Sequence, residues 1–445
     1  MSQMIEYQKK LRDLTGMAID YAQLLGADAV EVAASYAEGF SVQAHQGEVD
    51  TVEYDKTRSF AITVMIDKKR GSASTNEASE AAIRSAVTAA YEFARYAEED
   101  VFLSLPDVAE LAFDAPSQET CYPWDISVKD AIGLAIDCET MARTLDKRIH
   151  NTDGASVSSH QDCFVLANSL GFMNGYCSSS HQISCSPIAH IGDQMERDGD
   201  FTVATDPQDL WTIEQVARSA VKKTLARLGS RSVASTKVPV LFVDSAATSL
   251  IRQFMAAING GRIYRKSSFL VDHLGCPVFT SAMSIREVPY LPKGMGNSPF
   301  DDEGVRMREK FFIHDGVLEH YILSTYTANQ LKMKTTGNAG GVSNILVTHN
   351  MTKPFHDLIK HMGKGVIITE TMGDGLNLVT GDFSRGFCGF WVEHGAIQFP
   401  LHEMTVAGNL RDVFQGIVGM SDEVDLRSSV RTGALLVEEL TIAGS

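Results

Sequence analysis

The sequence predicts an α+β protein built from two domains, one at residues 1–230 and one at residues 236–445. Three observations point to this fold class. A pattern of helix, strands and helix occurs twice before residue 230, a polar segment follows at 230–237, and most of the chain beyond it is strand-like. A chain of 445 residues is also long enough to bury more than one core. We therefore expect an N-terminal domain of two duplicated helix–β-meander–helix units and a C-terminal β-rich, barrel-like domain.

The first unit is expected to begin with a helix at 3–25, because Leu11, Leu14, Met17 and further apolar residues follow helical spacing. A second helix, at about 77–96, closes the unit. The segments between these helices are rich in β-branched and small apolar residues, as strands are. We expect these strands at 29–34, 40–44 and 59–66.

The second unit repeats this order, with a helix at 127–145 before its strands and a helix at about 211–228 after them. We expect its strands at 155–158, 163–167 and 171–178. The closing helices of the two units contain similar stretches, Ile83–Val87 and Ala217–Val221. Such short sequence similarity can arise by chance in alanine-rich amphipathic helices, but the shared order of elements favours a duplication. The proline-containing segment 97–126 is the expected linker between the units.

The second domain opens with an expected strand at 238–243, which leads into a helix that contains Arg252. Asp315-Gly316 stands between two apolar runs and predicts a tight hairpin. A second hairpin is expected at His394-Gly395-Ala396. We also expect a second helix at about 408–418 and a last strand at 434–442. The domain should therefore be rich in strands, with these two helices, and form a barrel or a curled sheet.

Composition limits the classes of function. The formal charge is −17, with 56 acidic against 39 basic residues, which argues against a nucleic-acid partner. The N-terminus has no apolar signal core, and no apolar run approaches the length of a membrane span. The seven cysteines are scattered without a C-x-x-C pair, which is typical of reduced thiols in a cytoplasmic protein. We expect neither membrane nor nucleic-acid binding.

The segment 249–266 ends in Arg265-Lys266 after a glycine-containing turn. Aligned on this Arg-Lys pair, it resembles the helix that carries a His-Glu-x-x-x-His metal motif in the TldD/PmbA family of metallopeptidases. The two histidine positions hold Arg252 and Ala257, and the glutamate position holds Gln253. A zinc peptidase needs neutral imidazoles as ligands and a carboxylate as general base. Arginine stays protonated and alanine has no ligand atom, so this helix lacks the chemistry of the motif.

The resemblance covers nearly the whole chain. Matching segments lie at 263–270, 297–305, 335–341, 380–386 and 407–410. The resemblance implies a subunit without its own metal or other cofactor, which pairs with a TldD-like subunit that holds a zinc-type metal. A heterodimer is implied, and a homodimer is plausible because sister subunits share interface geometry. A late cysteine of the metal site has no counterpart at about 430–433. Family substrates are peptides and unfolded segments, such as antitoxins and peptide-antibiotic precursors.

The glycine-rich loop at 337–341 is the best candidate for substrate binding. Gly337, Asn338, Gly340 and Gly341 can expose backbone donors and allow a peptide to approach closely. The alternative is a tight connection between a helix at 324–333 and a strand at 343–348.

Two further groups of residues suggest metal sites, but each has a simpler explanation. Asp301-Asp302-Glu303 suggests a cation site, but Pro299 and Gly304 on either side favour an exposed turn. The histidine pairs 314/320 and 356/361 favour solvated or hydrogen-bonded side chains over metal ligands.

Two classes of function remain open at this point. The first is a non-catalytic subunit of a two-subunit metallopeptidase, in which Arg252 and Gln253 line a shared peptide chamber. The second is a stand-alone peptide-binding or regulatory protein without peptidase activity. A third reading, an independent hydrolase, would need catalytic residues that the sequence does not reveal.

Overall fold

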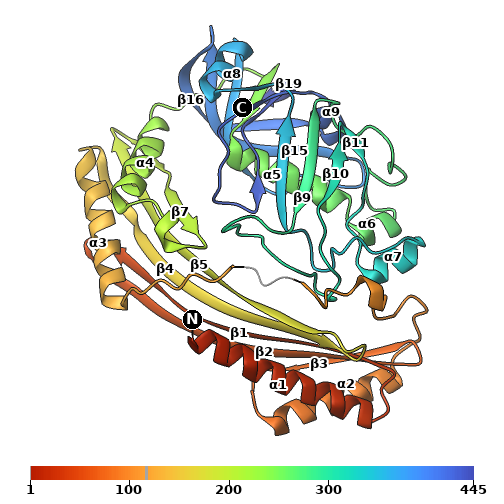
Figure 1. Ribbon diagram of the computed structural model, residues 1–445. Helices are drawn as coiled ribbons and strands as arrows, with labels where there is room; N and C mark the ends of the chain where they lie inside the picture. Colours follow the sequence, from red (N-terminus) through yellow and green to blue (C-terminus); the bar gives the residue numbers. More distant parts are fainter. Residues whose placement is uncertain (1, 116–118, 445) are drawn as a thin grey trace.

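A long, strongly curved sheet forms the N-terminal part of the computed structural model, which describes residues 2–115 and 119–444 (Figure 1). The strand order is β3-β2-β1-β4-β5-β6, and β7 also pairs with β5. The elements of this part are α1 (Ser2–Leu24), β1 (Ala29–His45), β2 (Glu48–Ile66), β3 (Lys69–Thr75), α2 (Glu80–Tyr96), α3 (Val128–Leu145), β4 (Ile149–Asn168), β5 (Met173–Ile191), β6 (Gln194–Arg197), β7 (Asp200–Ala204) and α4 (Ile213–Ala226).

The two halves of this sheet have the same order of elements, a helix, then strands, then a helix. They meet at the centre, where β1 and β4 pair in antiparallel fashion from Glu31↔Asn168 to Ala44↔Ala155. The predicted pair of helix–β-meander–helix units is therefore confirmed. Residues 116–118 of the expected linker lie outside the described residues.

The strands are longer than the sequence led us to expect. The separate strands predicted at 29–34 and 40–44 are one strand, β1, and those at 155–158 and 163–167 are both part of β4. The alternation of buried side chains continues through Tyr36, which is fully buried. Gly39 lies within this strand and allows β4 to approach closely. A Cβ at this position would lie 2.5 Å from the Ser159 carbonyl oxygen on β4. The expected breaks at these residues were wrong.

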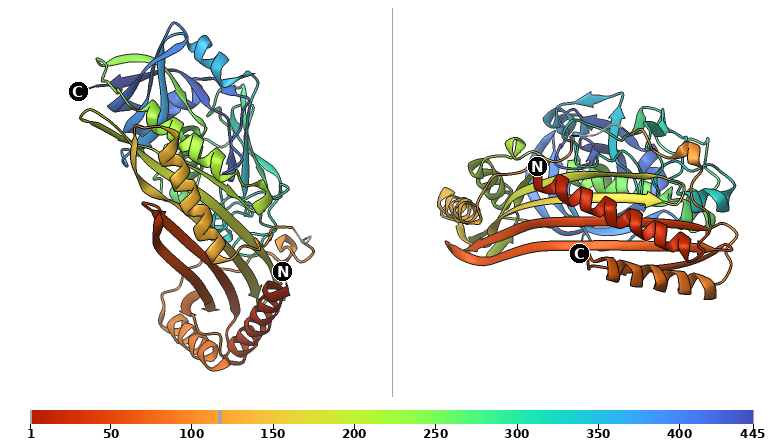
Figure 2. Two further views of the ribbon diagram at one scale, coloured as in Figure 1. Left: turned by 90° about the vertical axis from the view of Figure 1, so that its left-hand side faces the viewer. Right: turned by 60° about the horizontal axis from the view of Figure 1, so that its bottom comes forward.

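All four helices of this part pack on one face of the sheet. Val32 and Tyr36 of β1 lie in the core with α1 and α2, while Val42 lies in the core with α3 and α4. These residues share the parity that places side chains on one face of a strand. Figure 2 shows α1 and α2 at one end of the curved sheet and α3 and α4 at the other. The opposite, concave face is turned toward the C-terminal part of the chain (Figure 1).

The C-terminal part contains a closed five-stranded barrel. Its strands are β8 (Thr236–Phe242), β14 (Gly365–Met372), β15 (Asp382–Glu393), β16 (Ala396–Asn409) and β19 (Leu435–Ala443), and β19 pairs with β8 to close the ring. A second sheet has the order β11-β10-β9-β12-β18. Its strands are β9 (Met283–Val288), β10 (Lys310–His314), β11 (Val317–Leu318), β12 (Asn344–His349) and β18 (Val430–Arg431). The remaining strands, β13 (Thr352–Lys353) and β17 (Ile417–Ser421), extend the barrel sheet. The predicted β-rich, barrel-like fold is confirmed.

Both predicted hairpins of this part are present. Asp315 and Gly316 connect β10 to β11 with φ values of 47° and 82°, and His394 and Gly395 connect β15 to β16. The expectation of two helices was wrong. The structure has α5 (Asp244–Ala257), α6 (Gly260–Tyr264), α7 (Thr325–Leu331), α8 (Phe355–Met362) and α9 (Leu410–Gln415). Helices of five to eight residues are too short to give a clear hydrophobic period.

The two parts of the chain contact each other at both ends of the concave face. At one end, Phe300 packs against Phe164, Phe172 and Tyr176 of the N-terminal sheet, with ring centroids 5.4–6.3 Å away. At the other end, Arg427 pairs with Asp200 at 2.9 Å. The domain boundary expected between residues 230 and 236 stays a prediction.

The cysteines differ from expectation in one place. Cys163 and Cys177 stand directly opposite each other on β4 and β5 and form a disulfide. The expectation that all thiols are reduced is wrong for this pair, because strand pairing brings the two side chains together where sequence spacing gave no hint. No helix among the described residues is long and apolar enough to cross a membrane.

Candidate functional site

Helix α5 carries Arg252, Gln253 and Ala257, the three positions that the sequence resemblance matches to a metal motif. It follows β8 directly, and its apolar face, including Leu250, Ile251 and Phe254, is buried in the main core of the C-terminal part. The motif positions do not converge, since Arg252 is exposed, Gln253 is half-buried, and Ala257 is fully buried. The helix is thus held by packing, while its motif positions face different surroundings.

The residues at these positions do not suit a metal ion. Arg252 is cationic, and the Ala257 carbonyl is already taken by the Ser268 hydroxyl at 2.6 Å. The Gln253 side-chain oxygen is buried without a hydrogen-bond partner, and a single amide oxygen is a poor ligand set for zinc. Within residues 2–115 and 119–444, no group of three or more His, Cys, Asp or Glu side chains could hold a metal.

The two histidine pairs make ordinary polar contacts. His314 lies 3.2 Å from Glu319, and His320 lies 2.8 Å from the carbonyl oxygen of Phe311. On α8, His356 lies 3.1 Å from Asp357. These three histidines therefore bond to residues of their own segments, within nine positions in the chain.

The acidic turn at 301–303 is buried at Asp301, half-buried at Glu303 and exposed at Asp302. Asp301 is 4% exposed, so the predicted exposed turn was wrong for this residue. Its carboxylate accepts hydrogen bonds at 2.9 Å from the backbone N–H groups of Glu303, Val305 and Ala339. Local composition suggested a surface turn. Asp301 is buried instead because the distant segment that contains Ala339 packs against it and donates a hydrogen bond to its carboxylate. This bond also fixes the glycine-rich loop.

The glycine-rich loop has a buried half and an exposed half. Gly337 and Asn338 are buried, whereas Gly340 and Gly341 are exposed. The Asn338 amide nitrogen donates to both oxygens of Glu287 at 3.0 and 3.1 Å and to the Gly341 carbonyl oxygen at 3.1 Å. Gly340 has a φ of +83°, which favours glycine. Of the four predicted binding residues, Gly340 and Gly341 alone present their backbone to solvent.

A buried ion pair supports this loop. The Glu287 side chain is fully buried and lies 2.6 Å from the Lys310 ammonium, which is 9% exposed. Glu287 also accepts from the backbone N–H of Ser343 at 2.8 Å. Our sequence analysis missed this pair. A signal was present, because Glu287 shares the strand parity of the buried Met283 and Ile285.

A further carboxylate faces the acidic turn from the N-terminal sheet. Burial first, and then the negative charge of Glu303, raise the pKa of Glu31 to about 8. Burial likewise raises the pKa of Asp301 to about 7, against the three backbone donors that favour its charged form. The contact between the two parts of the chain therefore contains carboxyl groups that hold protons unusually well.

This arrangement predicts a pH dependence of stability. Because the pKa of Glu31 is raised from 4.5 to about 8 on folding, its contribution is full below about pH 4.5 and is lost as the pH rises through 8. Replacing Glu31 by Gln should leave the unfolding free energy nearly unchanged at low pH. At high pH it should raise that energy, by on the order of 2 kcal/mol. Denaturant titrations at several pH values give the unfolding free energy of each protein as a function of pH. The same pH dependence in the wild type and the variant would contradict the prediction.

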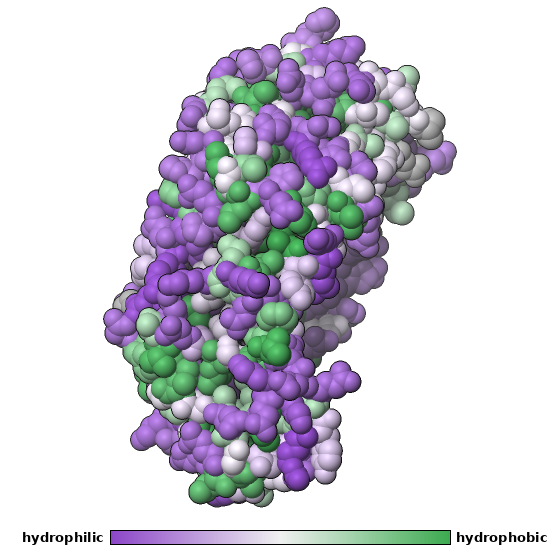
Figure 3. Space-filling model, turned by 90° about the vertical axis from the view of Figure 1, so that its right-hand side faces the viewer, coloured by the Kyte–Doolittle hydropathy of each residue, from purple (hydrophilic) through white to green (hydrophobic). Residues whose placement is uncertain are grey.

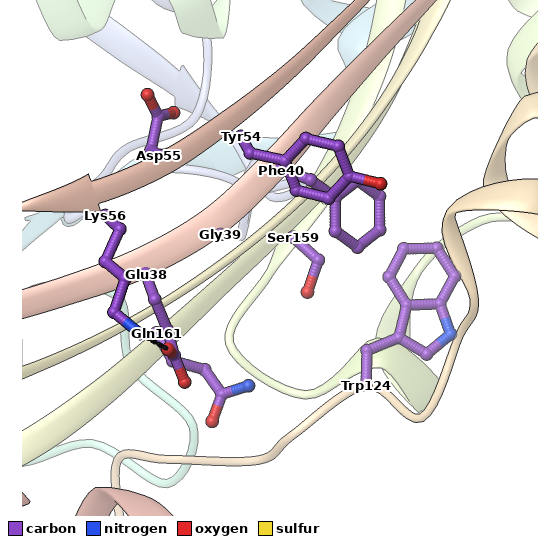
Figure 4. Close-up of a pocket in the computed structure, with 9 residues that line it drawn as sticks. All are labelled: Glu38, Gly39, Phe40, Tyr54, Asp55, Lys56, Trp124, Ser159 and Gln161. Carbon is purple, nitrogen blue, oxygen red and sulfur yellow. Dashed lines mark ion pairs between the residues drawn. The ribbon is translucent and has the colours of Figure 1, made fainter.

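A cavity of about 320 Å³ lies on the helix-bearing face of the N-terminal sheet. Phe40, Tyr54 and Trp124 surround it, and Ser159 lies between the rings in Figure 4. It is separate from the glycine-rich loop, because even-numbered β1 residues face the helices and the loop lies on the concave side.

On the face shown in Figure 3, apolar residues form separate patches among polar ones.

Comparison with known proteins places the whole chain in one family. Models of the PmbA/TldA metallopeptidases match at residues 30–94 (domain 1), 121–228 (central domain) and 235–444 (C-terminal domain). The metalloprotease PmbA of Escherichia coli O157:H7 is 40% identical over 444 residues, which are 100% of this chain and 98% of that protein. The PmbA homologue of Haemophilus influenzae is 39% identical over 98% of this chain and 97% of its own.

A solved structure shares the fold. The crystal structure of TldE from Thermococcus kodakarensis superposes with a TM-score of 0.81 at 18% identity and covers 97% of this chain and 100% of that one. Family models that together match most of the chain, and relatives of about 40% identity over its full length, agree. The chain therefore belongs to the PmbA/TldA metallopeptidase family.

Proposed function

We propose that this chain is the non-catalytic subunit of a two-subunit metallopeptidase and pairs with a TldD-like subunit that holds a zinc-type metal. One observation carries the proposal. Helix α5 carries the segment that resembles a metal-motif helix, yet Arg252, Gln253 and Ala257 supply neither ligands nor a general base. The retained scaffold makes physical sense if it still shapes a chamber that the partner's metal site serves.

Peptides and unfolded segments are the proposed substrates, including peptide precursors and antitoxins. The exposed backbone of Gly340 offers hydrogen-bonding groups to an extended peptide whatever its sequence, whereas Gly341 is exposed but already bonds to Asn338 through its N–H and its carbonyl oxygen. Arg252, exposed on α5, forms no ion pair among the described residues and is free to meet a peptide carboxylate. We place the complex in the cytoplasm, without nucleic-acid or membrane partners.

The alternative is a stand-alone peptide-binding or regulatory protein, which the same exposed loop would serve. Affinity purification of the tagged chain from native extract distinguishes the two. The proposal expects a TldD-like protein in roughly equal amount in the eluate. A chain that repeatedly elutes without such a partner, while still binding peptides, favours the alternative.

A further inference from the structure

Ser159 and His181 form a hydrogen-bonded pair on the helix-bearing face of the N-terminal sheet. They stand directly opposite each other on β4 and β5, and the Ser159 hydroxyl oxygen lies 2.9 Å from His181 Nδ1. His181 is fully buried, and Ser159, which is 5% exposed, lines the cavity of about 320 Å³ on this face. A serine hydroxyl beside an imidazole, at the wall of a cavity, is the arrangement that nucleophilic catalysis requires.

The second ring nitrogen of His181 fixes the direction of this hydrogen bond. Nε2 lies 2.8 Å from the backbone carbonyl oxygen of Tyr122, which can only accept. Burial lowers the pKa of His181, so the ring is neutral at pH 7 and carries its one proton on Nε2. Nδ1 therefore accepts from the Ser159 hydroxyl and is placed to act as its base. Tyr122 is held here because its N–H donates to Ser179 on β5 at 2.8 Å.

Aromatic side chains line the space beside the Ser159 hydroxyl. Phe40 stands opposite Ser159 on β1, and Tyr54 stands opposite Phe40 on β2. Ser159 lies between these rings and the ring of Trp124 (Figure 4). A lining of this kind suits a small apolar or aromatic group.

Gln161 is placed to bind the carbonyl oxygen of such a group. It follows Ser159 by two positions on β4, so both side chains line the cavity on the same face, about 7 Å apart along the strand. Its amide oxygen lies 4.0 Å from the Cys121 thiol, and no acceptor among the described residues bonds to its amide nitrogen. A donor at this position stabilises the negative oxygen that forms when a carbonyl carbon is attacked.

We propose that Ser159 and His181 form a reactive site, independent of any metal, that hydrolyses small esters with an apolar or aromatic acyl group. Ser159 Oγ bonds to the ester carbonyl carbon, and its proton passes to His181 Nδ1. The bond from this carbon to the leaving oxygen then breaks, and the proton passes from His181 to that oxygen to give an alcohol. Water repeats both steps on the acyl-serine, which releases the acid and restores the two residues. The inference goes beyond the proposed function and does not depend on it.

The third group of this site limits its substrates to esters. In serine hydrolases a carboxylate stabilises the imidazolium that forms during the reaction. The Tyr122 carbonyl takes that place here, and a dipole stabilises the imidazolium less than a charge does. The charged and titratable groups that act on His181 are His160 and Asp206, and Asp206 is already paired with Lys293 at 2.7 Å. Amide leaving groups need stronger acid assistance than ester leaving groups, so we expect no peptide cleavage at this site.

A serine-directed reagent tests the site on the purified full chain without a partner. A fluorophosphonate probe should add once, and mass spectrometry of the digested protein should place the adduct on Ser159. Ser159→Ala should abolish labelling, and His181→Gln should slow it about a hundredfold or more by removing the base. Ser158→Ala is the matched control and should be labelled as the wild type is. Ser158 lies on the opposite face of β4 and stands opposite Gln182.

Hydrolysis of p-nitrophenyl butyrate tests the complete cycle. The rate should rise with pH with a midpoint below 6.5, because burial lowers the pKa of His181 from that ordinary value. A chelator should have no effect, and circular dichroism confirms that each variant is folded. The proposal is overturned by a wild-type chain that is not labelled at Ser159, by wild-type labelling of His181→Gln, or by hydrolysis that persists in Ser159→Ala. Neither a metal nor the partner enters these assays, so their failure leaves the proposed metallopeptidase role untouched.

Discussion

Incubated alone with an unfolded peptide, the purified chain is expected to release no cleavage product, whereas an equimolar mixture with its TldD-like partner is expected to cleave the peptide. The reason is that, in the proposed function, Arg252, Gln253 and Ala257 stand at the positions of the groups that would bind a metal and activate water. Loss of such groups should separate the two rates by at least about a thousandfold. Product formation is followed by chromatography for each subunit alone and for both together.

Two controls make this assay specific. A chelator should abolish cleavage by the mixture, and so should removal of the metal-motif histidines from the partner. Restoring His, Glu and His at 252, 253 and 257 of this chain is not expected to restore activity, because the positions at 430–433 lack the late cysteine and the supporting contacts are absent. Full, chelator-insensitive cleavage by this chain alone would overturn the assignment.

Lys310→Met is expected to lower the unfolding free energy by about 3–5 kcal/mol, because it leaves the fully buried Glu287 as an unpaired charge. Glu287 would keep the donors from Asn338 and Ser343 but lose its cation. Chemical denaturation measures the change. Lys10→Met removes an exposed lysine and is the matched control, for which a change within about 0.5 kcal/mol is expected.

Lys310→Met should also increase the mobility of the glycine-rich loop, because Glu287 holds Asn338 of that loop through two hydrogen bonds. Hydrogen exchange at 337–341 reports this effect separately from global stability. If Lys310→Met lowers the unfolding free energy by less than about 1 kcal/mol, the prediction is contradicted, and Glu287 takes up a proton or reaches water at little cost.

The sequence predicted the N-terminal helices well, because α1 to α4 are long enough for apolar spacing to mark them. Ser79, Ser127 and Thr212 each cap a helix with a side-chain hydrogen bond. Strand lengths were harder to predict. The segment between the strands predicted at 29–34 and 40–44 continues β1 instead, and Gly39 within it permits close contact with β4, a strand more than a hundred residues away in the chain.

The candidate site could be predicted in part. The assignment of an altered metal motif to α5 rests on residue types and a resemblance, and it stays a prediction. The roles of Asp301, Asn338 and Glu287 depend on contacts between segments distant in the chain. Glycine content indicated a binding loop with exposed backbone donors, yet half of the loop is buried, and Asn338 bonds to a strand some 50 residues earlier. Composition cannot reveal such contacts. The one signal in the sequence was Glu287, a charged residue at the strand parity of the apolar Met283 and Ile285.

The central claim is that the catalytic metal of the pair belongs to the partner. Elemental analysis of the two subunits, purified together and then separated, tests it most directly. The account predicts about one transition-metal ion per partner chain and none in stoichiometric amount in this chain. About one tightly bound zinc per copy of this chain would contradict it.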